Sequence, residues 1–125
     1  MAYYQQHQPS ALGIDQISLF KLKDNVTEAE FEQLVNGATS LKAIPGVVSV
    51  TLDKNVIEPW MMDPNSGCNF THALRISFAS KDALRNYQDQ PIKTGLEDYC
   101  LNELTDGTMN LYFESPSNLE EQHDR

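Results

Sequence analysis

The sequence predicts a single α+β domain whose elements follow one another in the order β-α-β-β-α-β. Three observations support this. The 125 residues suit one domain and are too few for two. Four short runs show the alternation or the β-branched content that is typical of strands, and two regions show helical periodicity. Polar segments at 1–12 and 115–125 flank this domain, which we therefore expect over 13–114.

The first strand is expected over 15–23, where side chains alternate between two faces. Gln16, Ser18 and Phe20 share one face, and the intervening positions, which include Ile17, share the other. Both faces are partly apolar. We therefore expect this strand to be covered on both sides.

A helix is expected to begin at Thr27. Thr27 and Glu30 have the spacing of a capping box, in which each side chain satisfies a backbone N–H group at the helix start. Apolar residues then recur every three or four positions, at Phe31, Leu34, Val35, Ala38 and Leu41. Pro45-Gly46 ends the helical region.

Two further strands are expected, at 47–56 and 70–78, with an irregular loop at 57–69 between them. The third strand alternates cleanly and places His72 and Leu74 on one face. The loop holds the only tryptophan, Trp60. Trp60 either packs against the sheet edge or a partner subunit, or belongs to a lid over a ligand site.

The last third predicts helices at 80–87 and 91–104, a turn at Asp106-Gly107 and a final strand at 108–114. The resulting order is ferredoxin-like, a four-stranded antiparallel sheet with helices on one face. The opposite face needs a cover, and a second copy of the same sheet is the simplest one. The sequence thus predicts a homodimer.

Composition excludes several classes of partner. The net charge of −9 argues against nucleic acid and against anionic membrane surfaces. No apolar stretch approaches the roughly 20 residues that span a bilayer, and the N-terminus has no signal-like apolar core. We therefore expect a cytoplasmic protein with reduced thiols at Cys68 and Cys100, no nucleic acid or membrane partner, and no metal or cofactor.

Four segments, at 17–24, 41–47, 71–74 and 78–80, together resemble the stress-responsive A/B barrel family, in the family's order and spacing. They read Ile-Ser-Leu-Phe-Lys-Leu-Lys-Asp, Leu-Lys-Ala-Ile-Pro-Gly-Val, Thr-His-Ala-Leu and Phe-Ala-Ser. The resemblance implies a dimeric α+β barrel, with relatives that include the plant olivetolic acid cyclase. Some plant relatives hold magnesium through backbone carbonyls, at positions that match Leu41, Ile44 and Val47 here.

The resemblance also implies a catalytic stretch, Tyr-x-x-His-Pro-x-His in the cyclase. Tyr87 and Pro91 keep their positions, whereas Gln90 and Lys93 replace the histidines. An unperturbed lysine, with a pKa near 10.4, is protonated at neutral pH and cannot remove a proton α to a carbonyl as imidazole can. The cyclase mechanism is therefore not carried over intact.

The candidate site is a cavity between sheet and helices, where Gln16, Ser18 and His72 would converge with Phe20 and Leu74 beside them. Such a site suits a small apolar or aromatic molecule. The alternative function is a cofactor-independent cyclase, lyase or oxygenase of polyketide-like or aromatic carbonyl compounds. In that enzyme Tyr87 and His72 would be catalytic, and Lys93 or Gln16 would orient the substrate.

Structural roles are the competing interpretation of these candidates. His72 would be a hydrogen-bonded core residue, Tyr87 a packing residue and Lys93 a solvent-exposed cation. A cavity that both His72 and Tyr87 reach would favour the enzyme.

Overall fold

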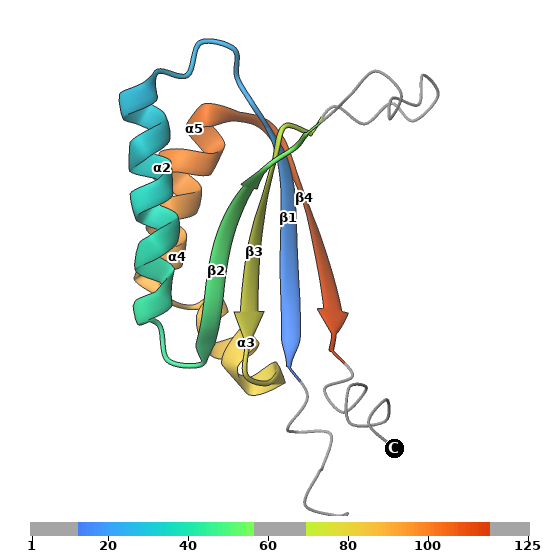
Figure 1. Ribbon diagram of the computed structural model, residues 1–125. Coiled ribbons are helices and arrows are strands. Elements are labelled where there is room, and N and C mark those ends of the chain that lie inside the picture. Colours follow the sequence, from blue (N-terminus) through green and yellow to red (C-terminus); the bar gives the residue numbers. More distant parts are fainter. Residues whose placement is uncertain (1–12, 57–69, 116–125) are drawn as a thin grey trace, which may run out of the picture.

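The structure is a computed structural model that describes residues 13–56 and 70–115 (Figure 1). The predicted 57–69 loop with Trp60, and almost all of the two predicted terminal segments, lie outside the described residues. One four-stranded antiparallel sheet has the order β2-β3-β1-β4. Its strands are β1 (Ile14–Leu22), β2 (Val47–Lys54), β3 (His72–Phe78) and β4 (Thr105–Glu114). The predicted α+β, ferredoxin-like fold is confirmed.

The first helix, α2 (Glu28–Ser40), begins at the predicted capping box. Thr27 Oγ1 accepts a hydrogen bond from the Glu30 N–H at 3.1 Å, and Glu30 Oε1 accepts one from the Thr27 N–H at 2.9 Å. A 3-10 turn (Leu41–Ala43) follows the helix. The chain then reverses at Gly46, whose φ of +90° lies in the region that favours glycine.

The second helical region has three short helices, α3 (Lys81–Gln88), α4 (Pro91–Leu96) and α5 (Asn102–Leu104). Ser80 caps α3, since its Oγ accepts a hydrogen bond from the Ala83 N–H at 3.1 Å. A π-helical turn (Glu97–Leu101) joins α4 to α5, and the Asn102 N–H donates to the Glu97 carbonyl across it. Such turns widen a helix by one residue and often occur at functional sites.

The predicted turn at Asp106-Gly107 is wrong, because both residues lie inside β4. β1 and β4 shift register there: Phe20 lies opposite Thr108, whereas Leu22 lies opposite Thr105. The extra residue of β4 forms a β-bulge, and the φ of +146° at Gly107 is one that glycine adopts readily. The Asp-Gly pair therefore bends a strand instead of reversing the chain.

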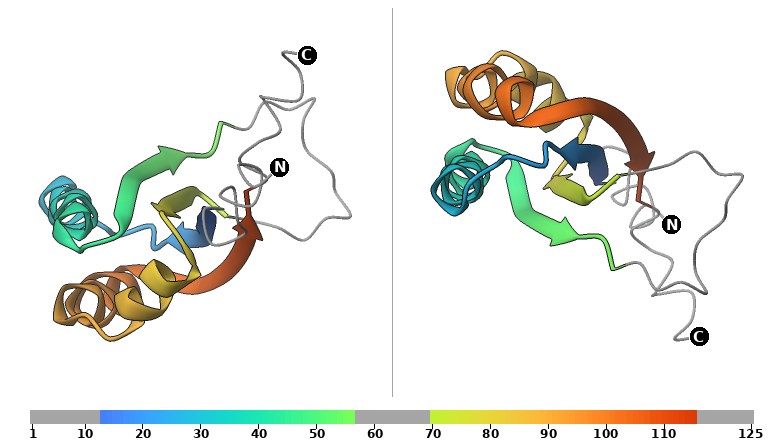
Figure 2. Two further views of the ribbon diagram at one scale, coloured as in Figure 1. Left: turned by 90° about the horizontal axis from the view of Figure 1, so that it is seen from below. Right: turned by 90° about the horizontal axis from the view of Figure 1, so that it is seen from above.

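The helices cover only one face of the sheet (Figures 1 and 2). The core lies between them and that face, and its most deeply buried side chains are Phe20, Phe78, Leu34, Leu41 and Ile76. The other face carries Ile17 and Leu19 on β1 opposite Leu111 and Met109 on β4. It is uncovered within the described residues. None of the described helices is long and apolar enough to cross a membrane.

Candidate functional site

A single aromatic side chain, Phe20, separates two cavities between the sheet and the helices. On the covered face of β1, Gln16 and Ser18 line one cavity and Leu22 lines the other. Phe20 lies between these positions, is fully buried and lines neither cavity. The sequence predicted one site here, and the structure has two.

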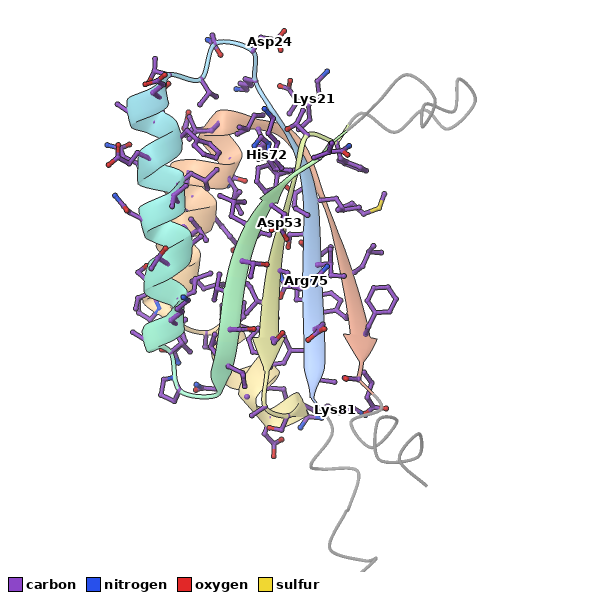
Figure 3. All side chains as sticks on the ribbon, viewed as in Figure 1. Lys21, Asp24, Asp53, His72, Arg75 and Lys81 are labelled. Carbon is purple, nitrogen blue, oxygen red and sulfur yellow. The ribbon has the colours of Figure 1, made fainter. Side chains whose placement is uncertain are left out.

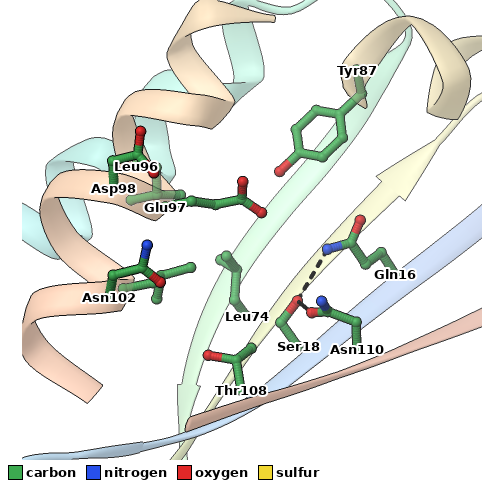
Figure 4. A pocket seen from close by; sticks show the side chains of 11 residues that line it. Gln16, Ser18, Leu74, Tyr87, Leu96, Glu97, Asp98, Asn102, Thr108 and Asn110 are labelled. Atoms are coloured by element: carbon green, nitrogen blue, oxygen red, sulfur yellow. Dashed lines mark hydrogen bonds between the residues drawn. The ribbon is translucent and has the colours of Figure 1, made fainter. Parts of the chain in front are cut away.

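The first cavity, which we call the polar cavity, has a volume of about 290 Å³ (Figure 4). The sheet, α3, α4, the π-helical turn and α5 contribute to its wall. Its apolar lining is Leu74, Leu96 and Leu101, and its polar lining is Gln16, Ser18, Tyr87, Glu97, Asp98, Asn102, Thr108 and Asn110. This lining is more polar than the sequence predicted.

A chain of hydrogen bonds lies on the sheet side of the polar cavity (Figure 4). Gln16 Nε2 donates to Ser18 Oγ at 3.0 Å, and the Ser18 hydroxyl donates to Asn110 Oδ1 at 2.6 Å. Gln16 Oε1 is buried and has no hydrogen-bond partner. If the side-chain amides of Gln16 and Asn110 were both rotated by a half turn, the hydrogen bonds would run from Asn110 through Ser18 to Gln16. Gln16 Nε2 would then lack a partner instead of Oε1. In either orientation, one polar atom of Gln16 is unsatisfied.

Tyr87 points its hydroxyl into the polar cavity toward the carboxylate of Glu97 (Figure 4). Its ring packs on Phe78, with centroids 4.9 Å apart. Burial raises the pKa of Tyr87 far above its usual range, and the negative charge of Glu97 raises it further. The hydroxyl therefore remains protonated and is suited to donate a hydrogen bond to a ligand oxygen.

Lys93 does not line the polar cavity. Its Nζ lies 3.0 Å from Glu97 Oε1, one helical turn along, and the Lys93 side chain is only 16% exposed. Glu97 does line the cavity, so Lys93 influences the site by holding that carboxylate in place.

His72 lines the second cavity (Figure 3). We call it the lysine cavity because Lys23 and Lys54 also line it. The His72 ring stacks on Phe20 with centroids 5.7 Å apart, and its Nδ1 lies 2.8 Å from Thr71 Oγ1. Tyr87 packs near the other end of β3, about 20 Å of strand away. The structure thus groups Gln16, Ser18, Leu74 and Tyr87 and keeps His72 apart from them.

Sequence reasoning missed five polar lining residues, Glu97, Asp98, Asn102, Thr108 and Asn110. Alternation along the last strand could have shown that Thr108 and Asn110 share a face. Nothing in the sequence marks the π-helical turn, which brings Glu97 and Asp98 to the cavity.

The described side chains form no metal-ligand cluster, and their one cysteine, Cys100, is partly buried. They contain no group of three or more His, Cys, Asp or Glu side chains that could hold a metal ion. The carbonyls of Leu41 and Ile44 accept hydrogen bonds from the Ile44 and Val47 N–H groups, both at 3.1 Å, so they stabilise successive turns. Burial raises the pKa of the Cys100 thiol, which disfavours the nucleophilic thiolate.

Comparisons with solved structures agree with this architecture. A hydroxynitrile lyase from Passiflora edulis superposes with a TM-score of 0.69 at 17% identity, over 83% of this chain and 94% of that one. A dimeric ferredoxin-like protein of unknown function from Thermobifida fusca gives 0.65 at 22% identity, over 83% and 92%. The cofactor-independent oxygenase SnoaB from Streptomyces nogalater gives 0.61 at 19% identity, over 86% and 96%.

Sequence comparison points to the same group of proteins. No curated protein matches the chain. The pattern of the stress responsive A/B barrel domain matches residues 14–118, which is most of the sequence. The chain therefore belongs to the stress-responsive A/B barrel domain family.

Proposed function

We propose that the protein is a cytoplasmic homodimer that binds a small hydroxylated aromatic molecule in the polar cavity. The observation that carries this proposal is the buried, unpaired Gln16 Oε1 at the end of the Gln16–Ser18–Asn110 chain. A buried polar atom without a partner costs free energy. Gln16 lines the polar cavity, so a turn of its amide would bring the unpaired atom within reach of a ligand that supplies the missing hydrogen bond. A hydroxyl group on the ligand suits either orientation of the Gln16 amide, since a hydroxyl both donates and accepts a hydrogen bond.

The other polar groups of the cavity narrow the ligand class. The protonated Tyr87 hydroxyl favours a carbonyl or another acceptor oxygen on the ligand. Glu97 and Asp98 disfavour a ligand anion, because like charges repel. At about 290 Å³ the cavity lies at the lower end of the usual range for ligand pockets. A neutral phenol that also carries a ketone or aldehyde, such as 4-hydroxyacetophenone, meets all three conditions.

We expect hydroxyacetophenones to bind more tightly than their methyl analogues. The test is an NMR titration with a panel of small phenolic ketones, each paired with its methyl counterpart, that follows the side-chain amide signals of Gln16 and Asn110. Gln16→Met removes the unpaired oxygen and should weaken phenol binding about five- to tenfold, which corresponds to one hydrogen bond. The control Gln88→Met changes an exposed glutamine of α3 and should leave the affinity unchanged.

Two results would contradict this proposal. One is a panel in which no phenol shifts the Gln16 or Asn110 amides. The other is equal binding of phenols and methyl analogues. Thermal unfolding of each variant separates a loss of binding from a loss of folding.

The alternative, a cofactor-independent cyclase or lyase, is favoured by one observation, the placement of Tyr87 and Glu97 in the same cavity. Tyr87 would donate a hydrogen bond to a substrate carbonyl while Glu97 accepted the proton that leaves the adjacent carbon. His72 would take no part, since it lines the other cavity. Turnover that both Tyr87→Phe and Glu97→Gln abolish, with binding retained, would favour this enzyme over a binding protein.

The homodimer is proposed to form through the uncovered face of the sheet. Large apolar side chains remain exposed on β4, with Met109 at 47% and Phe113 at 53%. They lie opposite Leu19 and Asp15 of β1. Leu19 and Ile17 of β1 extend the apolar surface. Contiguous apolar surface of this kind usually marks an interaction site. A solved relative from Thermobifida fusca is itself described as dimeric.

We expect Phe113→Glu to convert the dimer into a monomer. A charge within an apolar interface is left unpaired and desolvated, which typically costs several kcal/mol, and the carboxylate of Asp15 on the neighbouring strand would repel it. Light scattering at micromolar concentration should give twice the chain mass for the native protein and the chain mass for the variant. The control is Ile92→Glu on the helical side, where the side chain is 40% exposed and association should persist. A native protein of monomeric mass would rule out the interface.

A further inference from the structure

The lysine cavity is a second, open cleft of about 450 Å³, at the end of the sheet where β1 leads into α2. Its walls are mostly apolar, with Val26 and Phe31 on the α2 side and Leu22 and Leu52 on the sheet. These four side chains are partly buried and pack against the main core. The walls would hold the hydrocarbon part of a ligand.

The polar groups of this cavity are mainly cationic. Lys54 lies directly opposite His72 on the neighbouring strand, on the same face of the sheet. Lys23 leaves the end of β1, and Glu28 is the one acidic residue in the lining. The described ion pairs join Lys81 to Glu114, Arg85 to Asp82 and Lys93 to Glu97, so neither Lys23 nor Lys54 is paired within the described residues.

A cluster of positive charges that stay unpaired in the described part of the chain is unusual in a protein whose net charge is −9. A positive cluster beside an apolar cavity complements a ligand with one negative end and one apolar end. We propose that the lysine cavity binds a small amphiphilic carboxylate, whose anionic group contacts Lys23 and Lys54 and whose hydrocarbon tail packs on Phe31 and Val26.

Two backbone hydrogen bonds hold the turn at Lys23, beside the cavity. The Lys23 N–H donates to the Leu104 carbonyl at 2.9 Å, and the Val26 N–H donates to the Lys23 carbonyl at 3.3 Å. Both bonds fix the turn that leads from β1 to α2 and carries Lys23. The backbone of the turn that carries Lys23 is therefore fixed before a ligand arrives, which lowers the cost of binding.

His72 supplies a reporter inside the cavity. Its ring lies between Phe20 and Phe31, with ring centroids 5.7 and 5.4 Å away. Burial lowers the pKa of His72 in the free protein, and the positive charge of Lys54 lowers it further. Lys23, Lys54 and Glu28 are the charged groups that line the cavity with it. A bound carboxylate adds a negative charge nearby, so it should raise the pKa of His72.

Thr71 allows His72 to change charge without losing its hydrogen bond. Thr71 Oγ1 lies 2.8 Å from His72 Nδ1 and 3.4 Å from the Phe20 carbonyl oxygen. With neutral His72 the hydroxyl can donate to Nδ1. With protonated His72 it can accept from Nδ1–H and turn its own proton toward the Phe20 carbonyl. Protonation on ligand binding therefore leaves no buried group unpaired.

The test is an NMR titration of the whole protein with hexanoate, followed through the His72 imidazole signals, beside the neutral control hexanamide. Hexanoate should bind, raise the pKa of His72 and bind more tightly as the pH falls through the histidine range. The double variant Lys23→Gln with Lys54→Gln should weaken hexanoate binding about tenfold. Lys42→Gln removes the same kind of charge from an exposed position and should have no effect.

The proposal is wrong if hexanoate leaves the His72 signals unchanged or if hexanamide binds equally well. It is also wrong if Lys42→Gln weakens binding as much as the double variant does. The double variant changes only surface-accessible charges, and its thermal unfolding should match that of the native protein. These outcomes are independent of the polar cavity, since neither lysine lines it.

Discussion

Replacement of Gly46 by alanine is expected to lower the free energy of unfolding by about 2–5 kcal/mol. A left-handed φ costs a non-glycine residue roughly 1–2 kcal/mol, and overpacking adds about 1–3 kcal/mol. Both apply here, because Gly46 has a φ of +90° and an added Cβ would lie 2.4 Å from Ala83 Cβ. Urea unfolding measures the change as a lower midpoint at constant slope.

One control variant and one double variant help to interpret the result at Gly46. Gly95→Ala lies in α4 with nothing within 4 Å of the new methyl group, so it should be neutral or stabilise by up to about 1 kcal/mol. Ala83→Gly combined with Gly46→Ala removes the closest contact, to Ala83 Cβ, and leaves the backbone strain and a 3.3 Å approach to the Cα of residue 83. This pair should show a favourable coupling energy in a double-mutant cycle. A decrease in the free energy of unfolding of less than about 1 kcal/mol for Gly46→Ala would contradict this prediction. It would show that the backbone at Gly46 shifts easily to accept the new methyl group.

Phe20→Ala is expected to destabilise the domain by about 3–5 kcal/mol, which is the usual cost of removing a buried phenylalanine. Phe20 is 0% exposed, and its loss would also remove the ring that stacks on His72. The free energy of unfolding of small domains is typically about 5–15 kcal/mol, so this change removes a large share of it. Urea unfolding of the variant at neutral pH provides the measurement.

A matched control for Phe20 is Ile92→Ala, since Ile92 is 40% exposed on α4 and should lose less than about 0.5 kcal/mol. A loss below about 1.5 kcal/mol for Phe20→Ala would mean that neighbouring side chains collapse into the space. If the space stays open, the two cavities become continuous and the variant should accept phenols with longer substituents than the native protein does.

The elements that the sequence predicted well are those with local chemical signals. The Thr27 capping box, the Ser80 cap and the Pro45-Gly46 chain reversal each depend on side chains a few residues apart, and the structure has all of them. Alternation along β1 also predicted that Gln16 and Ser18 share a face. Such features are visible in sequence because their causes are local.

The errors concern features that depend on neighbours distant in the chain. Asp106-Gly107 has the composition of a turn, and only its pairing with β1 makes it a bulge. His72 was expected beside Gln16 because both face the helices, yet Phe20 separates their cavities. Alternation along a strand predicts which face a residue lies on. It does not predict whether a large side chain between two residues divides the space above that face into two cavities.

The π-helical turn at Glu97–Leu101 has an evolutionary consequence. A π-helical turn is equivalent to one residue inserted into an ordinary helix. The helices on either side of it remain anchored through Leu96 and Leu104, which are 5% and 8% exposed. A single-codon deletion in this turn would convert it into ordinary α-helix and shift the residues between these anchors, Asp98 among them, relative to the sheet. The number of residues in this turn, and not only their identity, therefore sets part of the lining of the polar cavity, so a change of one residue in length can alter the site without altering the fold.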